Sequence, residues 1–117
     1  SLYTNRVGDD GAIALANSKS LKNLETLDLS FNRIGDLGAE ALAKSTCLKN
    51  LKILHLDANR IGFKGMQALA ELSGLQNLET LNITYNLVHP QGLALLDNSE
   101  RLQNLGKVKT DVLKAED

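Results

Sequence analysis

The sequence predicts an α/β solenoid, in which short parallel strands form one layer and helices form a second layer behind it. Three observations lead to this prediction. The chain of 117 residues repeats its own pattern with a constant period of 27 residues, and such self-similarity is typical of repeat architectures. Each period contains leucines at alternate positions, which places them on one face of a strand. A segment rich in alanine and leucine then follows with helical spacing.

Four columns of residues define the period, because one asparagine, one glycine and two leucines recur in the same register. These columns are Asn5, Asn32, Asn59 and Asn86; Gly11, Gly38, Gly65 and Gly92; Leu15, Leu42, Leu69 and Leu96; and Leu21, Leu48, Leu75 and Leu102. Agreement among four independent columns leaves little room for chance. One unit of this length cannot bury its apolar face alone, so neighbouring units must stack.

The columns divide the chain into units of one domain. The domain 1–117 comprises a partial unit 1–23, full units 24–50, 51–77 and 78–104, and a degenerate C-terminal cap 105–117 with a last strand and a charged tail. The partial unit starts in the middle of a strand and shows no polar cap, which terminal repeats normally carry. We therefore expect a C-terminal piece of a longer protein, whose open N-terminal edge allows self-association.

Within a unit, the elements follow the order strand, turn, helix and return loop. Leu54 and Leu56 are expected to face inward from one strand, and Asn59 marks its end, where the amide can bond backbone groups within or between units. Asp36 is expected to favour the start of its own helix through the helix dipole, and Pro90 suits a first helical position. We interpret the glycine column as a close approach of helix to strand.

Composition limits the classes of partner. Lys and Arg number 13 and Asp and Glu number 14, so the net charge of −1 argues against broad electrostatic capture of nucleic acid or of an anionic membrane. No apolar run approaches the roughly 18 residues of a membrane span. The single cysteine, Cys47, excludes an internal disulfide framework and favours a reducing, cytoplasmic compartment.

Two motifs carry the resemblance to a known family. The N-R-I-G of residues 32–35 and the G-A-E-A-L-A of residues 38–43 resemble leucine-rich repeat proteins, in particular the ribonuclease-inhibitor-like and bacterial GALA-like subclasses. The resemblance covers roughly residues 2–105. It implies a right-handed leucine-rich-repeat solenoid with a curved parallel sheet inside and helices outside. It also implies binding of a protein or peptide partner through the concave face, and leaves open a role as a bacterial effector in a host cell.

Two features of the sequence could be taken for a catalytic or metal site. The G-x-x-G segments 8–11, 35–38 and 62–65 could suggest a phosphate loop, but their recurrence every 27 residues indicates structure. His55 and Asp57 share one strand face, where an acid–base pair or half a metal site is conceivable. No third ligand of suitable type shares that sheet, so we predict no catalytic residue, no cofactor and no metal.

Neighbouring strands lie about 4.8 Å apart whereas helices need about 10 Å, so we expect the strands to line a concave face. Residues that vary there between units are the candidate protein-binding site. They are Asp28, Phe31, Arg33, His55, Asp57, Arg60, Asn82, Thr84 and Tyr85. The arginines form either a solvated row or a basic strip for an acidic partner, and the aromatic rings either anchor a partner or cover the turn. The alternatives to a binding module are a structural spacer and an accessory domain of an enzyme.

Overall fold

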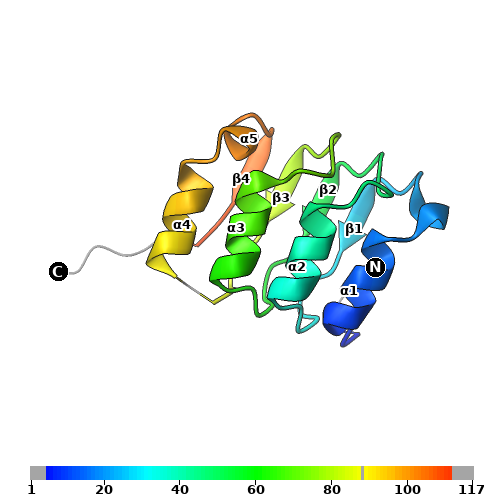
Figure 1. Cartoon of the computed structure of the whole chain (residues 1–117), viewed down its shortest axis with the longest axis horizontal. Coiled ribbons are helices and arrows are strands. Elements are labelled where there is room, and N and C mark those ends of the chain that lie inside the picture. Colours follow the sequence, from blue (N-terminus) through cyan, green and yellow to red (C-terminus); the bar gives the residue numbers. More distant parts are fainter. Residues whose placement is uncertain (1–4, 88, 112–117) are drawn as a thin grey trace.

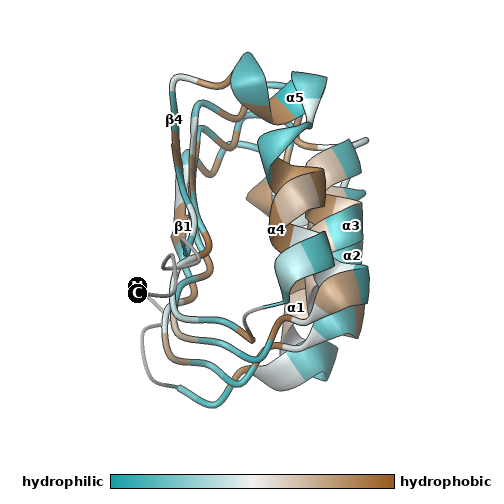
Figure 2. Ribbon diagram, turned by 90° about the vertical axis from the view of Figure 1, so that its left-hand side faces the viewer, coloured by the Kyte–Doolittle hydropathy of each residue, from teal (hydrophilic) through white to brown (hydrophobic). Residues whose placement is uncertain are grey.

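The computed structural model describes residues 5–87 and 89–111, which form two layers. One layer is a four-stranded parallel sheet in the order β1-β2-β3-β4, and the other is a row of four helices (Figures 1 and 2). The strands are β1 (Thr26–Asp28), β2 (Ile53–His55), β3 (Thr80–Asn82) and β4 (Lys107–Lys109). The helices are α1 (Gly8–Ala16), α2 (Asp36–Ala43), α3 (Phe63–Glu71) and α4 (Pro90–Asp97), with a 3-10 helix, η1 (Lys19–Leu21), and α5 (Glu100–Gln103) in return segments.

The strand register reproduces the sequence period. Leu27 pairs with Leu54, Leu54 with Leu81, and Leu81 with Val108, so each strand residue lies beside the residue 27 positions later. The parallel sheet and its row of helices confirm the predicted α/β solenoid. β4 lies in the predicted cap, while the expected strand at the start of the partial unit and most of the charged tail lie outside the described residues.

The hydrophobic core lies between the two layers. Leu54 and Leu56 have no exposed surface, which confirms that both face inward, and Leu69 of α3 is equally buried. Ile53 and His55, which alternate with these leucines, are half-buried on the face of the sheet that turns away from the helices. This is the face that the sequence analysis expects to be concave, and we refer to it as the outer face of the sheet. The alternation therefore decides which side chains a partner can reach.

Asparagine side chains join neighbouring units at the strand ends. Oδ1 of Asn59 accepts the backbone N–H groups of Asn32 and Ile34, both at 2.9 Å. Its amide nitrogen donates to the carbonyls of Leu29 and Leu56, both at 3.0 Å. Asn59 thus bonds its own unit and the preceding one, as the sequence predicted. The buried amide satisfies backbone groups that leave the sheet at the turn.

Asp36 lies in the first turn of its own helix, as expected, but its carboxylate also serves the next helix, and the glycines make a different contact from the one expected. Oδ1 of Asp36 accepts the N–H groups of Gly62 at 2.7 Å and Gly65 at 3.0 Å, so the carboxylate caps the next helix, α3. A Cβ on Gly65 would lie 2.8 Å from that oxygen and 3.3 Å from the Cβ of Ala39. At Gly38, Gly65 and Gly92, the missing side chain therefore allows a close approach to the preceding helix, and at the first two also to the isoleucine four residues earlier, rather than to a strand.

The last helix start is built from other residues. Phe63 occupies the position of Asp36 one unit later, and its ring lies against that of His89, with centroids 5.1 Å apart. Nδ1 of His89 accepts the N–H of Gly92 at 3.3 Å, so α4 is capped from within its own unit. Pro90 stands at the first position of α4, as predicted.

Candidate functional site

Three of the predicted site residues form a row across the sheet. Asp28, His55 and Asn82 end the first three strands and pair in register, so their side chains lie side by side on the outer face. All three are half-buried. The row offers a carboxylate, an imidazole and an amide at consecutive positions, separated by roughly 5 Å per strand.

Ser30 connects two acidic members of the site. Its hydroxyl lies 2.7 Å from Oδ1 of Asp28 and 2.7 Å from Oδ1 of Asp57 in the next unit. A hydroxyl has one proton to donate, so it serves only one of the two carboxylates at a time. The carboxylates consequently keep acceptor capacity for donors of a partner.

The Asp28 carboxyl is ionised at neutral pH. Burial raises its pKa, but hydrogen bonds from Ser30 and the charge of nearby His55 outweigh that effect, so the pKa lies below its ordinary value. Asn82 and Thr84 repeat the arrangement without a charge, because the Thr84 hydroxyl donates to the Asn82 amide oxygen at 2.8 Å. The outer face is therefore acidic at its β1 side and neutral at β3.

The two aromatic members extend from the turns that follow the strands. Phe31 is 50% exposed and Tyr85 is 77% exposed. Both adopt left-handed backbone conformations, with φ of 61° and 58°, and so does Ala58 between them. The same conformation in three consecutive units indicates that the turn imposes it, although bulky residues rarely adopt it. The result is that two large rings stand out on either side of a small residue.

Arg33 and Arg60 are exposed beside these rings. Within residues 5–87 and 89–111, neither guanidinium makes an ion pair. Leu87 takes their place in the next unit and is 57% exposed. The turns thus present a band of two aromatic rings, two arginines and one leucine along the carboxyl ends of the strands. We refer to Phe31, Arg33, Arg60, Tyr85 and Leu87 as the turn band.

The structure brings all nine predicted residues to one side of the molecule, on the outer face and along the turns beside it. Among the described residues, no three His, Cys, Asp or Glu side chains are grouped closely enough to hold a metal ion. The described helices include none that is both long and apolar enough to cross a membrane. The arrangement is chemically suited to noncovalent recognition by charge, hydrogen bonding and aromatic contact.

Comparisons with known families decide the assignment. The family model described as Leucine Rich repeats (2 copies) matches residues 22–71, and the one described as Leucine Rich repeat matches residues 4–16 and 74–96. The chain is a leucine-rich-repeat protein. Leucine-rich-repeat domains generally mediate protein–protein interactions and are typically non-enzymatic binding or scaffold modules. A comparison with curated proteins finds no match.

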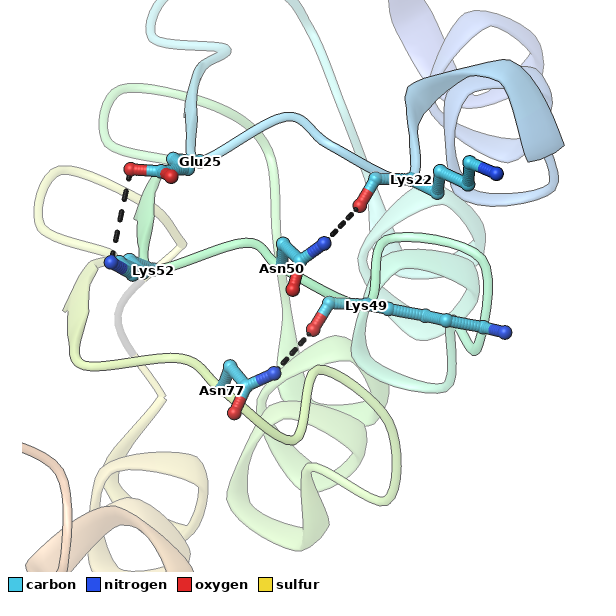
Figure 3. Close-up of polar contacts among 6 residues, drawn as sticks. All are labelled: Lys22, Glu25, Lys49, Asn50, Lys52 and Asn77. Atoms are coloured by element: carbon cyan, nitrogen blue, oxygen red, sulfur yellow. Dashed lines mark hydrogen bonds and ion pairs between the residues drawn. The ribbon is translucent and has the colours of Figure 1, made fainter.

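The loops at the amino ends of the strands, opposite the turn band, carry polar residues that the sequence analysis missed. The amide of Asn50 donates to the carbonyl of Lys22 at 2.8 Å, and that of Asn77 donates to the carbonyl of Lys49 at 2.6 Å (Figure 3). These asparagines belong to a further column of asparagines 27 residues apart, which the same search for recurring residues would have found. The column joins consecutive return loops, just as the Asn59 column joins consecutive turns.

Proposed function

We propose that this leucine-rich-repeat chain is a protein-binding module that recognises a protein or peptide partner through the outer face of its sheet and the turn band. The observation that carries the proposal is the exposure of Phe31 and Tyr85 beside Arg33 and Arg60, which make no ion pair in the described structure. Aromatic and arginine side chains are the usual anchors of interfaces.

The chemistry of the surface favours a partner of mixed polarity. Phe31 and Tyr85 can bury large apolar area at modest entropic cost, while the arginine forks suit carboxylates. Asp28 and Asp57 lie within the sheet and offer acceptors to a lysine or to backbone N–H groups. We infer a segment that places apolar and acidic groups on the turn band and donors over the sheet.

The helical back of every described full unit supports the ribonuclease-inhibitor-like or GALA-like subclass. It is compatible with an effector role but does not favour one. We also propose self-association through the first unit, because Val7, Leu15 and Leu21 are only partly buried while the corresponding residues of the next two units are enclosed. Sedimentation velocity should then show dimers that increase with concentration, whereas a monomer at all concentrations would exclude it.

The test is selection of a binding peptide from a random display library, followed by substitution. Phe31→Ala and Tyr85→Ala should each weaken the selected complex by about 1–3 kcal/mol if both rings are anchors. Glu40→Ala on α2 and Gln67→Ala on α3 are matched controls on exposed helical surface and should change the affinity little. A complex sensitive to the helical substitutions alone would overturn the proposed surface. Failure to select any peptide would favour a scaffold without its own ligand.

A further inference from the structure

A second surface lies at the amino ends of the strands, on the edge of the sheet opposite the turn band. There, η1 and the return loop between α2 and β2 line an open hollow of about 370 Å³. The side chains that line it are Lys19, Lys22, Thr46, Cys47 and Lys49. We refer to it as the lysine hollow. Three of its five lining residues are cations, and none is acidic.

In the part of the chain that the structure describes, none of these three lysines forms an ion pair. Within the described residues, the ion pairs of lysine are Lys44 with Glu40 at 2.9 Å and Lys52 with Glu25 at 3.8 Å. Figure 3 shows the side chains of Lys22 and Lys49 pointing to the same side, away from the pair formed by Glu25 and Lys52. The local field at the hollow is therefore positive although the whole chain carries a net charge of −1.

The backbone around the hollow is fixed before any ligand arrives. The Ser45 hydroxyl donates to the carbonyl of Ala16 at 2.6 Å and accepts the N–H of Leu48 at 3.3 Å, which ties the loop to α1. Asn50 holds the carbonyl of Lys22, and Asn77 holds that of Lys49. Only the lysine side chains remain to be ordered by a ligand, which lowers the entropic cost of binding.

We propose that the lysine hollow binds an acidic, extended segment of a protein partner through its carboxylate side chains. Lys22 and Lys49 stand at the same position in consecutive units, whose spacing lies between the about 4.8 Å of strands and the about 10 Å of helices. Alternate residues of an extended chain are about 6.6 Å apart and point to one side. Successive carboxylates at alternate positions therefore match successive lysines.

Other anionic partners fit the hollow less well. No aromatic side chain lines it, so it lacks the surface on which the bases of a single-stranded nucleic acid stack. The large hydrophobic side chains exposed in the described structure lie elsewhere, which leaves nothing at this edge to enter a membrane. An acidic protein segment needs neither. The surface is also separate from the turn band, so one partner could occupy each edge.

The test uses a capped synthetic peptide of alternating glutamate and serine, with a glutamine-and-serine peptide as control. Titration followed by NMR at low ionic strength should shift the backbone amides of residues 19–22 and 46–50. The variant Lys19→Gln/Lys22→Gln/Lys49→Gln should weaken binding by about tenfold, as expected for the loss of three exposed ion pairs. Lys64→Gln/Lys107→Gln/Lys109→Gln changes the net charge equally and should leave the affinity within about twofold.

Cys47 provides a second measurement, because it is the chain's single cysteine and lines the hollow. Saturating acidic peptide should slow the reaction of its thiol with neutral dithiodipyridine severalfold in the unmodified protein, and should not slow it in the variant without the hollow's lysines.

Three results would overturn the proposal. One is equal binding of the glutamine peptide, and another is equal weakening by the control variant, which would indicate attraction by bulk charge. The third is tighter binding of a single-stranded oligonucleotide or an anionic vesicle of the same charge than of the peptide.

Raising the ionic strength from about 0.01 M to about 0.15 M shortens the screening length from about 30 Å to about 8 Å. The higher ionic strength should therefore weaken binding of the acidic peptide to the lysine hollow.

Discussion

The helix starts of the interior units and of the last unit reach the same geometry with different chemistry. Asp9 caps α2 by accepting the N–H groups of Gly35 at 2.7 Å and Gly38 at 2.9 Å. Asp36 does the same for α3 from the start of α2. At α4, the acceptor is the imidazole of His89, which belongs to the helix it caps and makes a single bond at 3.3 Å.

This difference determines how each helix depends on its neighbour. A carboxylate from the preceding helix forms two charge-assisted bonds, so α2 and α3 are capped only while the previous unit is in place. A histidine within the unit gives a weaker, neutral bond but needs no such neighbour, and contact with Phe63 supplies the remaining attachment. At their helix starts, interior units are therefore coupled to their neighbours through charge, whereas the last unit is coupled through packing.

The difference between the helix starts should not extend into the hydrophobic core beneath them. Leu56 and Ile83 occupy the same column in the second and third full units, and both are buried. Leu56→Ala and Ile83→Ala should each lower the free energy of unfolding by about 2–5 kcal/mol, because each removes buried methyl groups and leaves a cavity. Urea denaturation measures this. A much smaller loss of unfolding free energy for Ile83→Ala than for Leu56→Ala would show that the two units differ in the packing of their cores.

Substitution of the glycines tests how tightly the helices approach. In Gly65→Ala, the new Cβ would lie 2.5 Å from Cγ2 of Ile61 and 2.8 Å from Oδ1 of Asp36. Neither atom can move away without loss of packing or of the cap, so we expect a cost of about 1–3 kcal/mol.

In Gly92→Ala, the nearest atom would be the sulfur of Met66 at 2.6 Å. A thioether adapts readily, so the loss in thermal stability should be clearly smaller than for Gly65→Ala. Equal losses in the two variants would show that the last helix start is as tightly packed as the interior one.

Removal of the acceptors compares the caps directly. Asp36→Ala leaves the N–H groups of Gly62 and Gly65 without their partner and should cost about 1–2 kcal/mol. His89→Ala should cost about 0.5–1 kcal/mol, because only one neutral bond and a ring contact are lost. Asp36→Asn keeps an oxygen acceptor and serves as the control, with an intermediate effect. A larger loss for His89→Ala would reverse the ranking of the two caps.

Transfer of the interior cap to the last unit is the most specific test. Phe63→Asp with His89→Gly recreates the residues found at Asp36 and Gly62. Each single change should destabilise the protein, while the double variant should recover part of the loss, with a coupling of about 0.5 kcal/mol or more. A double-mutant cycle of unfolding free energies gives this value. Strict additivity would mean that the aspartate cap does not depend on the facing glycine.

The sequence by itself determined the repeating architecture. Its period set the register of the sheet, and the alternation around Leu54 and Leu56 determined which face is buried. It also placed Asn59 at the strand end and the nine candidate site residues on one side, because a column of a solenoid faces one direction in every unit. Their role in binding stays a prediction.

Only the tertiary structure decided which group each polar residue serves. Asp36 lies in the first turn of its own helix, yet its carboxylate bonds the helix that begins 27 residues later, through the N–H of Gly62 just before it. Lys22 and Lys49 look like ordinary loop lysines in the sequence, and stacking of the loops places them on one hollow. A period shows that a contact recurs, but hydrogen bonds and electrostatic fields act through space. Their partners depend on the shift and spacing between units, which packing of the side chains sets.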